Sequence, residues 1–268
     1  MVNLALAAAL AAASPHALPL PNSDPAIFLV RDGDTTVYIF GTFHALDGKS
    51  AWFNDEVKDA FDRSGELVLE TLVPDKPAAR PAFGAGPSGR FSAPSVTPSA
   101  SFLATTKMAI NAGKSQGMSV GNGADMVLRR AAELDGKRLE GLETLESQLA
   151  MFGRMPPPAR AASPRPGDPV DTSGPMDSLS RAMVEMQSAW NRGDQTIFVH
   201  MLGQLERSAP DTYRMMFTER NARWADWIAA RMQTPGTVFV AVGAGHLAGK
   251  DSLLVRLAEQ GIESARLN

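Results

Sequence analysis

Four apolar runs, each ending in a polar group, constrain the fold of this chain more than any other feature. β-Branched and aromatic residues dominate the first and the last run, which favours buried strands. Patterns typical of helices separate the runs, and strands that alternate with helices predict a mainly parallel α/β sheet. The runs are TTVYIFGTFH (35–44), GELVLET (65–71), KRLEGLET (137–144) and TVFVAVGAGH (237–246).

The segments between and after these runs carry helical periodicity. Gly136 and Gly261 follow two of them and are predicted to end helices. A short last strand is predicted in ESARLN (263–268). The expected fold is therefore α/β, with a central, mainly parallel or mixed sheet flanked by helices and a block of helices in the middle of the chain. The helical segments are 51–64, 123–136, 144–155, 176–193, 194–208, 211–232 and 250–261.

A single domain is expected over 26–268, because 268 residues with 44% hydrophobic side chains can bury one sizeable core. Two segments inside it, 75–101 and 155–175, are rich in Pro, Ala, Gly and Ser and lack apolar periodicity. Such composition predicts flexible segments outside the core. The first directly follows a predicted strand, so a flexible lid is an alternative for it.

The N-terminal region 1–25 contains the Ala/Leu run LALAAALAAAS (4–14). The run is too short to span a bilayer and resembles the apolar part of a secretory signal, although no positive residues precede it. It predicts export to the periplasm or the cell surface, with an Ala-rich helical tail on a cytoplasmic protein as the alternative. No other segment approaches membrane-spanning length, so we expect no transmembrane helix.

Composition excludes several classes of site. The chain has no cysteine, which excludes a disulfide scaffold, a thiolate zinc site and a cysteine nucleophile. The net charge is -3 and no long basic stripe is present, so nucleic acid is not expected as a partner.

The four main strands end in two histidines and two glutamates, His44, Glu70, Glu143 and His246. In an open parallel sheet, ligands bind beyond the carboxyl ends of the strands. If these strands are neighbours, the side chains meet at one edge of the sheet. Such a set suits a divalent metal ion or a His/Glu acid–base pair.

Both histidines stand in a G-x-x-H context, GTFH (41–44) and GAGH (243–246). A glycine after an apolar strand lets the backbone turn sharply or approach a ligand, so Gly41, Gly243 and Gly245 are predicted to shape the turns. The chain has only four histidines. The other two, His16 in the leader and His200 on a predicted helix, are expected to be structural or incidental.

Each acidic candidate also suits a simpler, structural role. Glu70 and Glu143 fit the first turn of a helix, where the macrodipole favours a negative charge. Thr144 can cap the helix that follows Glu143. Asp125, in GNGADMV, is most simply an acid near a helix N-terminus.

The helix TERNARWADW (218–227) carries two further candidates, Arg220 and Asn221. Arg220 can neutralise a site carboxylate, grip a substrate carboxylate, or serve only the structure. The aromatic stripe beside them, Phe217, Trp224 and Trp227, has helical spacing and is expected to be core.

The stretch VGAGHLAGKDSLL (242–254) fits the dinucleotide-binding pattern G-x-G-x-x-G/A. That fingerprint requires an acidic residue about 20 residues further on, at the end of the next strand. Glu263 instead precedes the last predicted strand. A complete P-loop and the hydrolase elbow G-x-S-x-G are also absent from the sequence. We therefore expect no nucleotide, and a nucleotide-binding protein is only a weak alternative.

Several motifs together resemble the TraB/GumN family, which is related to the Tiki proteins and similar in fold to erythromycin-esterase-like and haem-binding ChaN-like proteins. The resemblance runs from about Ala26 to the C-terminus, apart from the two Pro-rich segments. The motifs are TTVYIFGTFHAL, ELVLET, LEGLETLESQLAMF, ERNARWADWI and FVAVGAGHLAGKDSLLVRLAEQGI.

The resemblance implies a peptidase that depends on a divalent metal ion, manganese or cobalt. It assigns the metal to His44, His246 and Glu70, with Glu70, Glu143 and Arg220 as catalytic candidates and Asn221 as a further family-like position. The expected substrate is a peptide or a surface-associated molecule. A metal-free, esterase-like hydrolase and a non-catalytic protein that binds haem, metal or a surface ligand are the alternatives.

Overall fold

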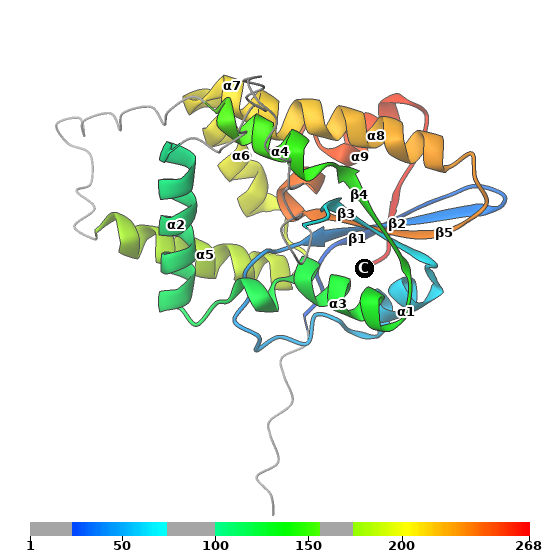
Figure 1. The fold of residues 1–268 in the computed structure, drawn as a ribbon, viewed down its shortest axis with the longest axis horizontal. Helices are drawn as coiled ribbons and strands as arrows, with labels where there is room; N and C mark the ends of the chain where they lie inside the picture. Colours follow the sequence, from blue (N-terminus) through cyan, green and yellow to red (C-terminus); the bar gives the residue numbers. More distant parts are fainter. Residues whose placement is uncertain (1–22, 74–99, 156–173) are drawn as a thin grey trace, which may run out of the picture.

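The computed structural model describes residues 23–73, 100–155 and 174–268, and its centre is a six-stranded sheet (Figure 1). The strand order is β4-β3-β5-β2-β1-β6. Strands β2, β5, β3 and β4 are parallel, whereas β1 pairs antiparallel with both β2 and β6. The sheet is therefore mixed and mostly parallel, as predicted. The strands are β1 (Ile27–Arg31), β2 (Thr35–Thr42), β3 (Glu66–Thr71), β4 (Arg138–Glu143), β5 (Gly236–Gly243) and β6 (Ala265–Arg266).

The four apolar runs all form strands, and the last short strand is also present as β6. Strand β1, which forms a hairpin with β2, was not predicted. The sequence does contain an indication of this hairpin. The tripeptide Asp32-Gly33-Asp34 stands between two apolar runs, and Asp-Gly is typical of hairpin turns. The Asp32 carboxylate accepts hydrogen bonds from the backbone N–H groups of Asp34 and Thr35, which holds the turn.

The helices cover both faces of the sheet (Figure 1). Their N-termini include residue types that favour helix starts: Asn54, Thr144 and Ser252 each cap a helix through a side-chain oxygen. The helices are α1 (Asp55–Arg63), α2 (Ala100–Ser115), α3 (Ala124–Leu134), α4 (Leu145–Gly153), α5 (Pro175–Asn191), α6 (Thr196–Ser208), α7 (Pro210–Tyr213), α8 (Glu219–Arg231) and α9 (Leu253–Glu259). Short turns of 3-10 helix span Val120–Asn122 and Ala244–Leu247, and a π-helical turn spans Arg214–Thr218.

Two hydrophobic cores lie on the two faces of the sheet. One packs α1, α3 and Trp190 of α5 against Phe40 and Phe239. The other packs α8 and α9 against alternate residues of the same strands, including Ile39 and Val240. Because neighbouring strand residues point to opposite faces, continuous apolar runs supply both cores. The predicted helical stripe also contributes, since Trp224 is fully buried.

Helix α2 was not predicted, because its apolar residues do not gather on one face. Met108 and Ile110 stay exposed although α2 packs along α5. The ends of the two Pro-rich segments are helical, since α2 begins at Ala100 and α5 begins with Pro175 in its first turn. The rest of both segments, and residues 1–22 of the leader, lie outside the described residues. Among the described helices, none has the length and apolar character needed to cross a membrane.

Candidate functional site

The carboxyl ends of β2, β3, β4 and β5 form one edge of the sheet, because these four strands are parallel. Glu143 at the end of β4 lies opposite Thr71 of β3. The predicted strand-end residues therefore meet at one edge, as the pattern of apolar runs indicated. The residues that follow or end these strands there are His44, Glu70 and His246.

Arg220 lies at the centre of this cluster and joins both glutamates. Its Nη2 donates to Glu70 Oε2 at 2.7 Å and also to Glu143 Oε1, while its Nε donates to Glu143 Oε2 at 3.2 Å. Its Nη1 lies 3.4 Å from the Met216 carbonyl oxygen and 3.3 Å from His246 Nε2. A guanidinium has five N–H donors, so each has an acceptor here.

This guanidinium is buried, with 4% of its side chain exposed, and the Glu143 side chain is 6% exposed. The ring of Trp224 lies 4.5 Å from the Arg220 guanidinium carbon and covers it from one side. The π-helical turn Arg214–Thr218 directly precedes α8 and supplies the Met216 carbonyl. A π-helical turn next to a polar cluster is often part of a functional site.

His246 is held in one orientation by Asn221. Its Nδ1 lies 2.7 Å from Asn221 Oδ1, and Asn221 Nδ2 donates to the Asp251 carbonyl oxygen at 2.7 Å. Because that carbonyl can only accept, the Asn221 oxygen must face the imidazole, and Nδ1 must carry the proton. The lone pair of Nε2 therefore points toward Arg220 and Glu70, whose Oε1 lies 3.8 Å away.

The ring of His246 packs between Phe217 and Trp224, with centroid distances of 4.8 and 4.5 Å. Burial lowers the pKa of His246 to about 3, and the positive charge of Arg220 acts in the same direction against the attraction of Glu70. The imidazole is therefore neutral at physiological pH. The aromatic stripe that the sequence assigned to the core thus also forms two walls of the site.

His44 lies at the open side of the cluster, with 62% of its side chain exposed. Its Nδ1 lies 3.2 Å from Asp125 Oδ1. Desolvation opposes protonation, but the hydrogen bond and charge of Asp125, together with the charge of Glu70, raise the pKa of His44 above its usual value. Asp125 was predicted only as a helix-start acid, and it does lie in the first turn of α3. Its contact with His44 depends on how α3 packs and has no local sequence signal.

Three groups converge on Gly243. A Cβ atom built on this glycine would lie 3.2 Å from Glu70 Oε1, 3.5 Å from His44 Nε2 and 3.7 Å from His246 Cδ2. The backbone N–H of Gly243 also donates to Glu70 Oε1 at 2.7 Å. Glycine at this position therefore lets two histidines and a carboxylate approach one point beside the strand end.

The three predicted glycines act by making room rather than through a conformation reserved for glycine, because none of them has a positive φ. A Cβ atom on Gly41 would lie 3.3 Å from the Ala244 Cα, and one on Gly245 would lie 3.3 Å from the Phe217 ring. Of the two roles expected for a glycine there, a sharp turn or a close approach, these distances support the close approach. In the same loop, Gly249 does have a positive φ, of 83°.

Glu70 is held as a carboxylate. Burial acts to raise its pKa, but His246, the Arg220 guanidinium, His44 and the Gly243 N–H lower it to about 2. Glu66, at the other end of β3, behaves in the opposite way, because burial and the neighbouring Glu140 raise its pKa. The two carboxylates of this strand therefore have pKa values shifted in opposite directions.

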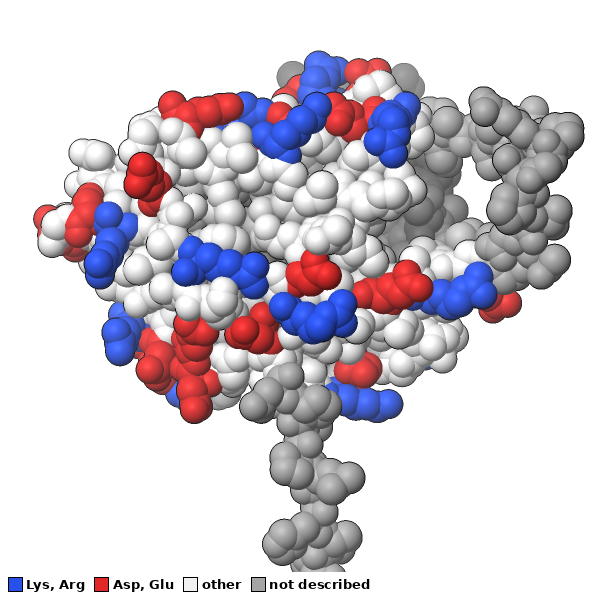
Figure 2. Space-filling view, turned by 180° about the vertical axis from the view of Figure 1, so that it is seen from behind, with Lys and Arg blue, Asp and Glu red and all other residues white. Residues whose placement is uncertain are grey.

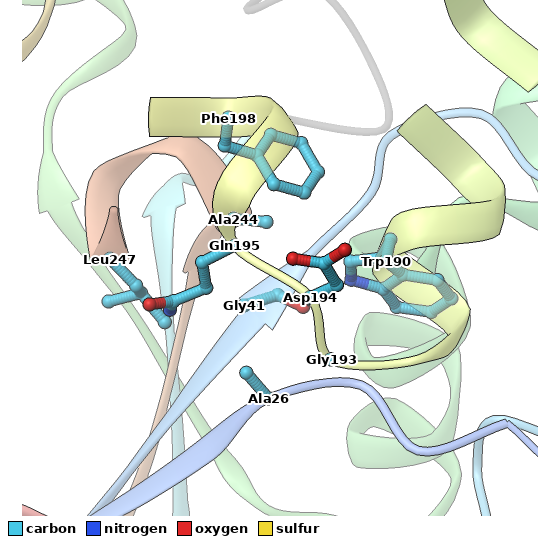
Figure 3. A pocket seen from close by; sticks show the side chains of 9 residues that line it. All are labelled: Ala26, Gly41, Trp190, Gly193, Asp194, Gln195, Phe198, Ala244 and Leu247. Atoms are coloured by element: carbon cyan, nitrogen blue, oxygen red, sulfur yellow. Dashed lines mark hydrogen bonds between the residues drawn. The ribbon is translucent and has the colours of Figure 1, made fainter. Parts of the chain in front are cut away.

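Two hollows lie near the cluster. The first is bounded by Trp190, Phe198 and Leu247 and shares only Gly41 with the predicted site residues (Figure 3). The second has Ala45, the residue after the exposed His44, in its lining. Its lining is Ala45, Ile110, Gly113, Lys114, Met118, Ser119, Val120 and Gly121.

The surface on the far side of the molecule carries mixed charge. Figure 2 shows lysine and arginine side chains interspersed with aspartate and glutamate, without a continuous area of one sign. Such a surface provides no extended electrostatic footprint on that face.

The comparison with known proteins agrees with the motifs that form this cluster. The model of the TraB/PrgY/gumN family matches residues 26–86 and 88–266, which include both G-x-x-H blocks, both glutamates and Arg220. No curated protein and no solved structure matches the chain. Because the family match spans nearly the whole chain and includes every strand of the sheet, this protein belongs to the TraB/PrgY/gumN family.

Proposed function

We propose that the protein is a metal-dependent hydrolase, most simply a peptidase, with His44, His246 and Glu70 as the metal ligands. One observation carries the proposal: Glu70 Oε1, His44 Nε2 and the His246 ring all lie within 4 Å of a single point at Gly243. Two imidazoles and a carboxylate are a donor set that suits manganese, cobalt or a similar divalent ion.

The oxygen atoms next to both histidines support this assignment. Each Nδ1 has an oxygen partner, Asp125 for His44 and Asn221 for His246, so each Nε2 is the atom presented to the site. Metal-binding histidines characteristically use the second ring nitrogen in this way, which fixes the tautomer and the orientation of the ring.

The charge of the cluster also favours a cation. Once both imidazoles are neutral, as metal binding requires, the carboxylates of Glu70, Glu143 and Asp125 face the single guanidinium of Arg220. Three negative charges against one positive charge leave an excess that a divalent ion would neutralise. Buried carboxylates are stable only when they are paired or bind a metal, which makes such neutralisation favourable.

Arg220 must give up its contact with His246 before a metal ion can bind there. Its Nη1 lies 3.3 Å from His246 Nε2, and no three His, Asp or Glu side chains in the described parts of the chain are already grouped as ligands. A metal ion on Nε2 therefore requires Nη1 to move away, while Nη2 and Nε keep their carboxylate partners. The residues fit the ion once this one contact is released.

A divalent ion bound here would supply Lewis acidity for the attack of water on a peptide carbonyl. The protein's own residues would hold the reacting groups. Arg220 fixes Glu70 and Glu143 through its Nη2 and Nε donors, so we assign it a positioning role rather than the binding of a substrate carboxylate. Glu143, which lies beside the proposed metal ligands, would orient the reacting groups or take up a proton. Substrate would enter beside His44, where the cluster is open.

A metal-free hydrolase is the second candidate, and the contact between Arg220 Nη1 and His246 Nε2 favours it. In that case His44, the exposed imidazole, would act as the acid–base group, with Asp125 as its orienting carboxylate. A binding protein without turnover, for haem, a metal or a surface ligand, is the third. The Ala/Leu run at 4–14 supports export to the periplasm or cell surface, with the cytoplasm as the alternative compartment.

The test uses the purified full chain, stripped with a chelator and then supplied with Mn²⁺ or Co²⁺. A peptide library is incubated with it, and products are identified by mass spectrometry. We expect cleavage that requires the metal and disappears in His246→Ala, whereas His200→Ala, on the exposed face of α6, cleaves like the native chain.

The other outcomes separate the alternatives. Cleavage that resists the chelator but still requires His44 indicates the metal-free hydrolase. Stoichiometric metal binding without cleavage of any peptide indicates a binding protein. Cleavage that survives both chelation and His246→Ala contradicts a role for this site.

A further inference from the structure

A chain of hydrogen bonds continues behind His246 beyond Asn221. Asn221 Nδ2 donates to the backbone carbonyl of Asp251, and the Asp251 carboxylate accepts from Tyr213 Oη at 2.9 Å. The other carboxylate oxygen is paired with Arg256. These contacts link α7, α8 and α9 through one aspartate that does not touch the site itself.

The residues of this chain are shielded from water. His246, Asn221 and Tyr213 are all buried, and only 17% of the Asp251 side chain is exposed. Water therefore cannot readily replace the Asp251 carbonyl as the partner of Asn221. A buried amide keeps its orientation only when its protein partners fix both ends, because an unsatisfied group there is costly.

The Asp251 carbonyl would be poorly placed without its own carboxylate. It lies in the turn between Leu247 and α9, where Gly249 has a positive φ of 83°. Tyr213 comes from α7 and Arg256 from α9, so the carboxylate attaches this turn to two separate helices. Tyr213 also stacks on Phe217, which packs against His246.

We propose that Asp251, anchored by Tyr213, is a positioning residue that sets the tautomer of His246. The Asp251 carbonyl forces the Asn221 amide to turn its oxygen toward His246, and this oxygen holds the proton on Nδ1. Nε2 thereby keeps its lone pair as an acceptor on the side of Arg220 and Glu70. The inference rests on the proposed function in one respect only, namely that Nε2 is the atom of His246 that binds the metal ion.

The decisive experiment reads the tautomer directly, without metal or substrate. The full chain is labelled with ¹⁵N in its histidine rings, and the ring nitrogen shifts of His246 are recorded near pH 8 in the presence of a chelator. The sequence has only four histidines, so His246→Gln assigns the signal. In the native chain, we expect His246 to carry its proton on Nδ1.

Asp251→Ala is expected to lower the ratio of the Nδ1-protonated to the Nε2-protonated form by about tenfold, which corresponds to one neutral hydrogen bond. Asp251→Asn should restore most of the native ratio, because its amide oxygen can still accept from Tyr213. Asp226→Ala is the control, since Asp226 is an exposed aspartate of α8 that contacts only Gln260 among the hydrogen bonds described.

If Asp251→Ala does not fold, Tyr213→Phe decides the question, because it removes one hydroxyl and keeps the ring. A smaller shift of the ratio in the same direction supports the inference. A folded Asp251→Ala or Tyr213→Phe chain with the native ratio overturns it. This result is distinct from failure of the proposed function, which would appear as absence of metal-dependent cleavage with the tautomer effect intact.

Discussion

Arg220 Nη2 donates to Glu70 Oε2 at 2.7 Å, although the two residues are 150 positions apart in the sequence. The same guanidinium binds Glu143, 77 positions away. One arginine of α8 thus connects the ends of β3 and β4 and holds two carboxylates inside the protein. This arrangement makes Arg220 important both for stability and for the geometry of the site.

Replacement of Arg220 by methionine should destabilise the fold strongly. The change leaves Glu70 and Glu143 buried without their cation, and loss of one partner of a buried ion pair costs about 3–5 kcal/mol. Arg214→Met is the matched control, because the Arg214 side chain is 62% exposed and its ion pairs are worth less than about 1 kcal/mol. Urea unfolding of the metal-free proteins measures both. Equal losses of unfolding free energy in the two variants would contradict a buried role for Arg220.

Gly243→Ala should impair the site more than the fold. The new Cβ would lie 3.2 Å from Glu70 Oε1, so this carboxylate must move by a few tenths of an ångström, and it would contact His44 Nε2 at 3.5 Å. We expect a loss of about 1–2 kcal/mol in unfolding free energy, typical of an overpacked position, and at least about a tenfold loss in metal affinity.

Gly33→Ala serves as the control for this change, because a Cβ on Gly33 meets no atom within 4 Å. Its stability should remain within about 1 kcal/mol of the native value, with unchanged metal affinity. Native affinity in Gly243→Ala would show that the three groups do not act at this point.

The two glutamates of β3 should give opposite pH dependences of stability in the metal-free protein. The pKa of Glu70 is lowered to about 2, so its contribution is present above pH 4.5 and is lost as the pH falls from there toward 2. The pKa of Glu66 is raised, so its contribution is present below pH 4.5 and is lost as the pH rises through the folded pKa.

Thermal unfolding of Glu66→Gln and Glu70→Gln between pH 2 and 8 measures these two effects. Glu70→Gln should remove part of the acid loss of stability, which is on the order of 3 kcal/mol for a shift of this size. Glu66→Gln should instead reduce the change of stability with pH above pH 4.5. The assignment fails if the two variants change the same limb of the profile.

Much of the fold was predictable because its central strands are buried on both faces. β2 and β5 are continuous apolar runs with β-branched residues, a pattern typical of the central strands of a parallel sheet. β1 was missed because its apolar run is short and the hairpin turn was not recognised. α2 was missed because exposed apolar residues such as Met108 blur its helical periodicity.

The edge of the sheet was predictable for a topological reason, since parallel strands present their carboxyl ends together. The partners that orient the site were not. Neither the contact between Asp125 and His44 nor the one between Asp251 and Asn221 is local in the sequence. The burial of Arg220 also depends on carboxylates from two distant strands, so the sequence alone favoured a solvated or structural arginine.

The steric role of Gly243 shows a further limit of sequence reasoning. Its place after an apolar strand predicted a sharp turn or a close approach, and its φ of -54° leaves the close approach as the reason for glycine. What favours glycine is the Glu70 carboxylate, 3.2 Å from a Cβ at this position, and only the packed structure reveals that neighbour.

Binding of Mn²⁺ to the chelator-stripped full chain, measured by isothermal titration calorimetry, is the sharpest test of a metal site at Gly243. We expect one site in the native chain and in His200→Ala, and an affinity at least about a hundredfold weaker in His44→Ala and in His246→Ala, because each change removes one ligand. Native affinity in both His44→Ala and His246→Ala, with each variant folded, would contradict a metal site shared by the two histidines.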